Sequence, residues 1–207
     1  TLVNLSSSGI KEVVIIIGYK GEKIKHTFGS EFSGMKIIYL ENKDYATTNN
    51  MYSLWIARKY LELGALLIEG DVLFDPTILQ KALEMNNTNS YWILDQFQAG
   101  MDGSMSIADQ AGRIIEIRII QGALPLYLPT YFKSVGILKI TPSYGKLFSH
   151  WLEEEVHKNN LNIYYDLVLS KHILEHPLMV CNIAGLRWIE IDNPEDLKKA
   201  EKYFQAI

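Results

Sequence analysis

An unbroken run of aliphatic residues, Val13-Val14-Ile15-Ile16-Ile17, is the feature that most narrows the folds open to this chain. A strand with one solvent-exposed face alternates apolar and polar residues. A continuous β-branched run is instead typical of a strand in a parallel sheet that is buried on both faces. Parallel strands need crossover connections, which are usually helices. The run therefore predicts an α/β protein.

The segments after this run supply the expected alternation of strand and helix. Residues 22–28 predict a short helix, and residues 35–40 predict a second strand. Asn49 or Asn50 can cap a helix that runs to about residue 61, and an apolar strand over 65–68 follows it. This order indicates a parallel sheet with right-handed crossovers in the first half of the chain.

The second half has a different pattern, in which strands follow one another with little helix between them. The predicted strands are 92–94, 105–108, 113–120, 134–140 and 188–192, and the predicted helices are 144–157, 166–174 and one that begins at Pro194. Asp109-Gln110-Ala111-Gly112 is typical of a hairpin turn. A mixed sheet in a single domain over residues 1–207 is the resulting expectation.

Composition excludes several classes of function. A chain of 207 residues with 48% apolar residues and a net charge of -4 can build one sizeable core. It has no block of Lys and Arg, which argues against nucleic-acid binding, and no apolar run of roughly 20 residues that could cross a membrane. The single Cys181 excludes a disulfide framework and favours the reducing cytoplasm.

Asp71 is the strongest candidate for a chemical role. It follows the strand 65–68 within Glu69-Gly70-Asp71, and open α/β sheets bind ligands beyond the carboxyl ends of their strands. The polar segment from Thr48 to Trp55 opens a helix whose amides can donate to phosphate or base oxygens. Together they predict a site for a nucleotide and its metal. The alternative is that Asp71 only caps a turn.

A second acidic motif, Glu190-Ile191-Asp192, lies in the last predicted strand. Alternation along a strand puts Glu190 and Asp192 on one face, where both could meet Asp71. Two carboxylates together with ligand phosphates are the usual way to hold Mg²⁺. The alternative is that Asp192 caps the following helix and Glu190 is solvated.

Two further positions are candidates for ligand contact. Tyr164-Tyr165-Asp166 sets two aromatic rings beside a carboxylate, which suits an organic cation, although the rings could belong to the core and Asp166 could be the N-cap of a helix. Gly18 ends the first strand, where it could let the backbone approach a ligand or only form a turn.

Taken in order, five segments of the chain resemble the nucleotidyltransferase family. They are 10–19, 49–54, Glu69-Gly70-Asp71, Tyr165-Asp166 and 188–197. The likeness is greatest to bacterial choline-phosphate and 2-aminoethylphosphonate cytidylyltransferases, with sugar-1-phosphate nucleotidyltransferases more distant. The resemblance implies a Rossmann-like, GT-A-like domain of three α/β/α layers with a mixed central sheet.

The resemblance also implies a reaction. A phosphate or phosphonate oxygen would attack the α-phosphorus of CTP or another nucleoside triphosphate and release pyrophosphate with the help of Mg²⁺. By the family pattern Asp71 holds the metal, with Glu190 or Asp192 as the second ligand, and Asp166 lies by the substrate as an amine counter-ion or a further metal ligand. The predicted nucleotide contacts are Asn49, Asn50, Ser53 and, from its place after the first strand, Gly18.

The chain departs from the family pattern in two places. The first strand and glycine-rich loop of the family, with an Arg and a later Pro-Lys, have no counterpart after Thr1, and we expect that segment upstream. Choline enzymes have a Trp near the position of Ser104 or Met105, so a primary amine such as 2-aminoethylphosphonate competes with phosphocholine as the acceptor. The pattern leaves open a homodimer or fusion to a larger enzyme.

Three other functions compete with this interpretation. Glu69-Gly70-Asp71 also approximates the acidic metal motif of glycosyltransferases that use nucleotide sugars. A sugar-1-phosphate nucleotidyltransferase would share most of the same motifs. A non-catalytic nucleotide-sensing or scaffold domain is the third alternative.

Overall fold

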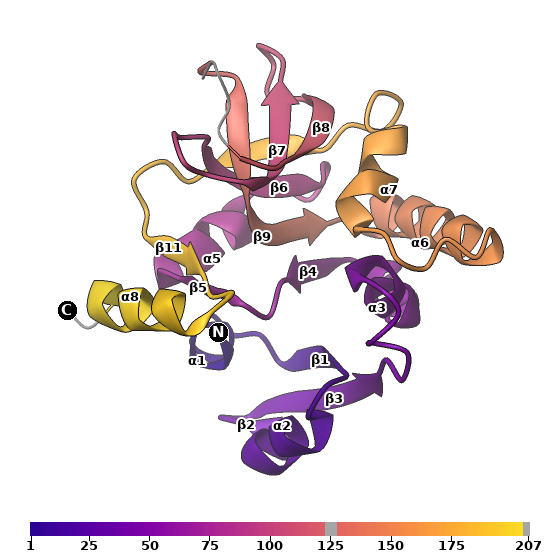
Figure 1. The fold of residues 1–207 in the computed structure, drawn as a ribbon, viewed down its shortest axis with the longest axis vertical. Coiled ribbons are helices and arrows are strands. Elements are labelled where there is room, and N and C mark those ends of the chain that lie inside the picture. The colour runs from indigo at the N-terminus through magenta and orange to yellow at the C-terminus, as the bar shows by residue number, and fades with distance from the viewer. Residues whose placement is uncertain (123–127, 205–207) are drawn as a thin grey trace.

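The computed structural model describes residues 1–122 and 128–204, which form an α/β domain (Figure 1). The helices are α1 (Leu2–Ser7), α2 (Gly21–Phe28), α3 (Asn50–Ile56), α4 (Arg58–Leu61), α5 (Pro76–Glu84), α6 (Pro142–His157), α7 (Tyr165–His172) and α8 (Pro194–Phe204). The strands are β1 (Glu12–Ile17), β2 (Glu31–Phe32), β3 (Met35–Glu41), β4 (Ala65–Ile68), β5 (Val72–Phe74), β6 (Tyr91–Gln96), β7 (Gly103–Ala108), β8 (Ile114–Ile120), β9 (Tyr131–Ile140), β10 (Met179–Asn182) and β11 (Trp188–Glu190).

The strands form three sheets. The largest has the order β10-β6-β9-β7-β8, with β4 also paired to β9, and the two smaller sheets are β1-β3-β2 and β11-β5. β1 runs parallel to β3 and β6 runs parallel to β10, while the other pairs are antiparallel. The expected mixed sheet is confirmed. The expectation that β4 continues a parallel sheet is wrong, because its described partner is the antiparallel β9.

The core confirms a layered arrangement. Trp92 and Leu94 of β6 pack into one buried cluster with residues of α6 and α7. Tyr91 and Ile93, which alternate with them, pack into a second cluster with residues of α5. Successive side chains of a strand point to opposite faces, so β6 is covered by helices on both sides.

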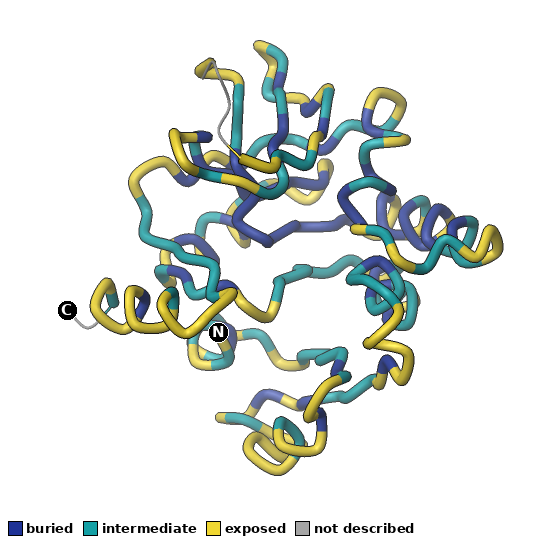
Figure 2. Tube along the Cα trace, viewed as in Figure 1, coloured by how far each residue is buried: buried dark blue, intermediate teal, exposed yellow. Residues whose placement is uncertain are grey.

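β1 and β4 do not have the burial that their sequences predict. Within the part of the chain that the structure describes, β1 pairs with β3 alone and β4 pairs with β9 alone, which leaves one edge of each strand without a partner. Val13 to Ile16 and all of β4 are half-buried (Figure 2), whereas Ile17 is buried. We call these the two open edges.

Short polar caps explain where several helices begin. The side chains of Asp75 and Thr141 accept hydrogen bonds from Thr77 and Tyr144, each with a proline in the first turn of its helix, α5 or α6. Asn49 caps α3 as predicted. The single helix expected through residue 61 is instead two helices, α3 and α4, which meet at Ala57.

Other expectations about the helices and strands were only partly right. α5 and β10 were not predicted, although both contribute buried residues. In α8, Leu197 and Tyr203 are exposed, while Ala200 is buried. Cys181 is buried in β10.

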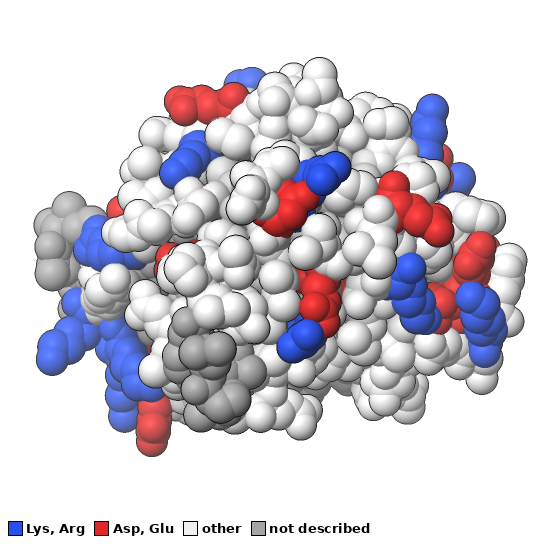
Figure 3. Space-filling view, turned by 90° about the horizontal axis from the view of Figure 1, so that it is seen from above, with Lys and Arg blue, Asp and Glu red and all other residues white. Residues whose placement is uncertain are grey.

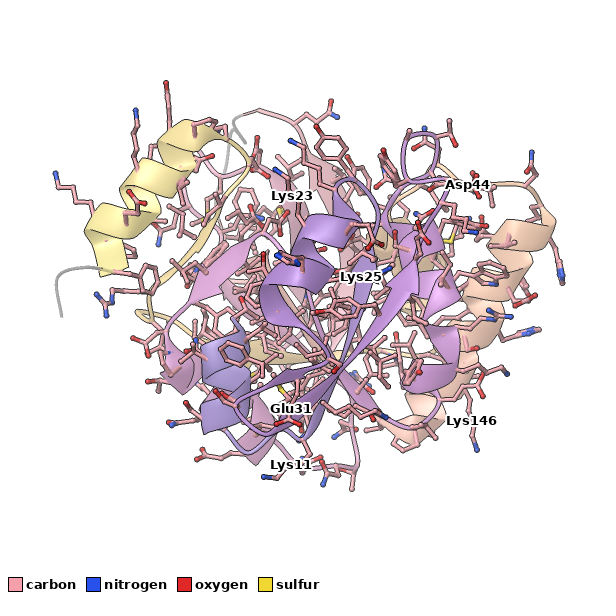
Figure 4. All side chains as sticks on the ribbon, turned by 90° about the horizontal axis from the view of Figure 1, so that it is seen from below. Lys11, Lys23, Lys25, Glu31, Asp44 and Lys146 are labelled. Carbon is pink, nitrogen blue, oxygen red and sulfur yellow. The ribbon has the colours of Figure 1, made fainter. Side chains whose placement is uncertain are left out.

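The surface carries charged side chains of both signs. On the face seen in Figure 3, basic and acidic side chains lie near one another over much of the surface, and several basic side chains gather at its left end. α2, with Lys23 and Lys25, covers the β1–β3 pair on the side seen in Figure 4. No helix among residues 1–122 and 128–204 is long and apolar enough to cross a membrane.

Candidate active site

The acidic motifs at positions 69–71 and 190–192 meet where β4 ends. The Glu69 amide donates to the Gly136 carbonyl of β9 at 2.8 Å, and the Ile191 amide donates to the Asp71 carbonyl at 2.9 Å. These backbone bonds bring the end of β4 next to the end of β11. Asp71, Glu190 and Asp192 accordingly line one cavity of about 550 Å³, as their positions in the sequence predicted.

Glu69 is the most perturbed acid in this cavity. Burial, and next the negative charge of Asp166, raise the pKa of Glu69 to about 7, against a hydrogen bond from the Tyr165 hydroxyl that lowers it. Its surroundings therefore favour the protonated form more than water does for an exposed glutamate. A cation bound nearby would favour its ionised form.

Space for the Glu69 carboxyl depends on a glycine in β9. Gly136 has a φ of +72°, and a Cβ at this position would lie 2.6 Å from Glu69 Oε2 and 3.0 Å from Val72 Cγ2. Any side chain would have to displace the carboxyl or the neighbouring valine. Gly136 thus leaves free the space that the Glu69 carboxyl occupies.

Asp166 lies buried in the first turn of α7, with 4% of its surface exposed. The N-cap of this helix is Tyr164, so the alternative that Asp166 caps it is wrong. Burial raises the pKa of Asp166 to about 6, while a hydrogen bond with Ser104 and the charge of Lys133 lower it. A buried acid held beside an open cavity is a fitting counter-ion for a ligand cation.

Lys133 of β9 is the cationic member of the site. Its Nζ donates to Glu190 Oε1 at 2.8 Å and lies 5.6 Å from the centre of the Trp188 ring. Trp188 is in turn held by its Nε1, which donates to Asp95 Oδ2 at 2.8 Å. Burial raises the pKa of Glu190, and the charge of Lys133 opposes that shift.

A second cavity of about 570 Å³ adjoins the first. Asp95 and Trp188 line it, and it shares four lining residues with the first cavity: Asp102, Lys133, Glu190 and Asp192. The Lys133–Glu190 pair therefore stands at the junction of two lobes of one cleft.

The predicted nucleotide contacts fall into two groups. Asn50 and Ser53 line the first cavity, where the Asn50 Oδ1 also accepts from the Tyr165 amide at 3.0 Å and the Ser53 Oγ accepts from Asn42 at 3.0 Å. Asn49 caps α3, and Gly18 packs so closely on Tyr45 that a Cβ would lie 2.7 Å away. Neither Asn49 nor Gly18 is among the lining residues of the two cavities, and all four contacts stay predictions.

The donor set of the cleft suits a hard cation such as Mg²⁺. Its carboxylates are oxygen donors, and the pKa of Glu69 is raised first by burial and then by the negative charge of Asp166. Within the described residues, no three acidic, histidine or cysteine side chains are gathered closely enough to hold a metal by themselves. One or two carboxylates with ligand phosphates would suffice, so the metal role of Asp71, Glu190 and Asp192 stays a prediction.

Three contributors to the site were missed by sequence reasoning: Glu69, Lys133 and the Tyr165 hydroxyl. Glu69 stood two residues before the predicted Asp71, at the same strand end, and could have been included on that ground. Lys133 precedes the apolar stretch of β9, and a lysine next to a buried strand is a weak but usable signal.

A mixed sheet between helices, with an acidic cleft beyond the end of β4, defines an α/β protein of the nucleotidyltransferase type. No family model matches the chain. It is 30% identical over 210 residues, or 99% of its length, to CMP-5'-(3-aminopropyl)phosphonate synthase of Streptomyces rubellomurinus. The chain spans 33% of that relative, about a third of its length.

Two further comparisons cover nearly the whole chain. The 2-aminoethylphosphonate cytidylyltransferase of Lancefieldella rimae is 23% identical over 201 residues, which is 95% of this chain and 76% of that protein. The structure of CTP:phosphocholine cytidylyltransferase from Streptococcus pneumoniae superimposes with a TM-score of 0.78 at 19% identity, over 97% of this chain and 82% of that one. The chain is therefore a homologue of cytidylyltransferases and has the nucleotidyltransferase fold, as its motifs indicated.

Proposed function

We propose that this chain carries the active site of a cytidylyltransferase that moves CMP from CTP to a small amino-bearing phosphonate or phosphate. The observation that carries the proposal is the cleft itself, in which acids from β4, α7 and β11 surround one buried lysine. A zwitterionic acceptor needs such a mixture of charges. The names of the relatives, which include an aminopropylphosphonate and an aminoethylphosphonate enzyme, point to the same substrate class.

In the proposed reaction, an oxygen of the acceptor forms a bond to the α-phosphorus of CTP. The bond from that phosphorus to the bridging oxygen breaks, and pyrophosphate leaves. Asp71 with Glu190 or Asp192 would hold Mg²⁺, which supplies charge neutralisation for the triphosphate. The other residues of the cleft would position CTP and the acceptor, since this chemistry needs no protein nucleophile.

The acceptor's amino group would lie against Asp166. This carboxyl is buried and beside the cavity that Tyr164 and Tyr165 also line. A nearby ammonium group would stabilise its ionised form, as Lys133 already does in part. Ser104 makes a hydrogen bond with the same carboxyl, where choline enzymes are expected to have a tryptophan, and this favours a primary amine over a quaternary one.

A screen of pyrophosphate release tests the proposal in the full-length protein. CTP, UTP, dTTP and ATP would each be paired with 2-aminoethylphosphonate, 3-aminopropylphosphonate, phosphocholine, phosphoethanolamine and glucose 1-phosphate. We expect turnover with CTP and an aminoalkylphosphonate or its phosphate analogue. Release only with a sugar 1-phosphate, or with no pair at all, would overturn it.

We also propose that the triphosphate-binding strand and glycine-rich loop expected upstream of Thr1 complete the sheet between the two open edges. Ile16 of β1 and Leu67 and Ile68 of β4 line the same cavity, which supports a position between these strands. Amide hydrogen exchange in the full-length protein tests it. We expect protection of the β4 amides that point away from β9, and rapid exchange there would refute the proposal.

A further inference from the structure

Lys133 is a buried lysine with more hydrogen-bonding capacity than its surroundings use. Its side chain is 5% exposed, and the structure gives its Nζ one hydrogen-bond acceptor, Glu190 Oε1, within the described residues. An ammonium group has three donors and no acceptor. Two donors thus remain for oxygens that enter the cleft.

The charge distribution of the cleft gives this lysine a special position. Among the described residues that line the two cavities, Lys133 is the one Lys or Arg. The acids that line them are Glu69, Asp71, Asp95, Asp102, Asp166, Glu190, Asp192 and Asp196. A cation or an amine has many acidic partners here, whereas an anionic group has one cationic side chain among the described lining residues.

Access to the ammonium group is kept open by Gly103, the first residue of β7. Its φ is +84°, and a Cβ at this position would lie 3.2 Å from Lys133 Nζ. A side chain at position 103 would crowd the Nζ on this side. With glycine, an oxygen of a ligand can approach Lys133 there.

We infer that Lys133 binds the phosphonate or phosphate oxygens of the acceptor and so determines its specificity for an anionic group. The inference rests on the proposed function for the identity of the acceptor. The two ends of a zwitterion are thereby separated: Lys133 takes the anionic end at the junction of the two lobes, and Asp166 takes the amine. The competing interpretation is that Lys133 is only the counter-ion of Glu190.

Calorimetric titration of the full-length protein separates these interpretations without requiring turnover. The titrants are 2-aminoethylphosphonate, ethylphosphonate, which lacks the amine, and CTP with Mg²⁺. We expect Lys133→Met to weaken both phosphonates about 10- to 100-fold, the range for a lost hydrogen bond to a charged group, while the affinity for CTP changes less than about threefold. Lys133→Arg should keep most of the phosphonate affinity.

Two further variants control for structure. Lys139→Met removes another largely buried lysine of β9, one that binds the Leu83 and Met85 carbonyls away from both cavities, and should leave phosphonate affinity unchanged. Lys133→Met leaves the negative charge of Glu190 without its partner. The double variant Lys133→Met/Glu190→Gln removes that unpaired charge as well. If Lys133 is only a counter-ion, the double variant regains phosphonate binding; if Lys133 binds the ligand, it does not.

The outcomes distinguish this inference from the proposed function. Ethylphosphonate binding that is lost in Lys133→Met supports the inference, even if the nucleotide screen shows no turnover. A wild-type protein that binds neither phosphonate overturns it. So does an equal loss of CTP and phosphonate affinity, or recovery in the double variant.

Discussion

The hydroxyl of Tyr165 donates a 2.9 Å hydrogen bond to Glu69 Oε1 and so joins the first residue of α7 to the end of β4. The Tyr165 amide donates to Asn50 Oδ1 of α3 at 3.0 Å. One buried tyrosine therefore holds three elements that surround the first cavity. Glu69 is half-buried, so the loss of its donor carries a cost.

We predict that Tyr165→Phe lowers the free energy of unfolding by about 1–3 kcal/mol, because the half-buried Glu69 carboxyl loses its hydrogen-bond donor. Urea denaturation followed by circular dichroism measures this change. Tyr164→Phe is the matched control, since Tyr164 is 46% exposed and its substitution should change stability by less than about 0.5 kcal/mol. Equal stability of the two variants would count against the Tyr165–Glu69 bond.

Gly136→Ala should be more damaging than an alanine at another glycine with positive φ. Gly100 has a φ of +85° with no atom within 4 Å of a Cβ, so alanine there costs only the left-handed conformation, about 1–2 kcal/mol. Gly136→Ala adds the clash with Glu69, and we expect a further loss of about 1–3 kcal/mol by the same denaturation measurement. Similar losses in both variants would mean that Glu69 moves aside freely.

Asp71→Asn is predicted to abolish turnover in the full-length protein while leaving the fold intact. Asp71 is exposed, and its described link to β11 uses the backbone carbonyl, which the substitution keeps. We expect a loss of at least about 100-fold in kcat/KM, with stability within about 0.5 kcal/mol of the wild type. Glu201→Gln, an exposed acid of α8, is the control. An active Asp71→Asn enzyme would refute the metal assignment.

Glu155 of α6 should make the protein sensitive to acid. Its side chain is 4% exposed; burial raises its pKa, but hydrogen bonds from Lys171, Asn160 and Lys158 outweigh burial and lower it to about 2. A carboxyl with a lowered folded-state pKa stabilises the protein above its unfolded pKa and loses that contribution as the pH falls towards 2.

The corresponding experiment follows thermal unfolding of the wild type and Glu155→Gln from pH 6 to pH 2. The wild type should lose up to about 3 kcal/mol from this group below about pH 4.5, and the variant should lack that part of the slope. Glu154→Gln, on the same helix but 42% exposed, should follow the wild type. Parallel curves for wild type and Glu155→Gln would contradict the prediction.

Local patterns were sufficient for much of the fold. The aliphatic run of β1, the Asn49 cap of α3 and the turn at Asp109 all depend on neighbouring residues, and the structure confirms them. The pairing of β4 was wrong because it depends on β9, far along the chain, and an apolar strand does not reveal the direction of its partner.

The residues of the candidate site likewise include some that local patterns predict and others that depend on distant parts of the chain. Asp71 could be placed because a strand end is a local signal, and its meeting with Glu190 was predicted from the alternation of residues along the last strand. Lys133 could not be placed, because its role depends on Glu190, which lies 57 positions away along the chain. Pairs of charges at such separation are brought together by the fold and leave no periodic trace in the sequence.

The two open edges bear on how copies of this chain behave toward one another. An uncovered strand edge presents amide and carbonyl groups that can template pairing with another polypeptide, and proteins usually block such edges with charges or proline. The interior of β1 and all of β4 are aliphatic and carry no such gatekeeper residue. If these edges stay uncovered, pairing between copies of the chain would begin there, and the strand that we propose between them would also block such pairing.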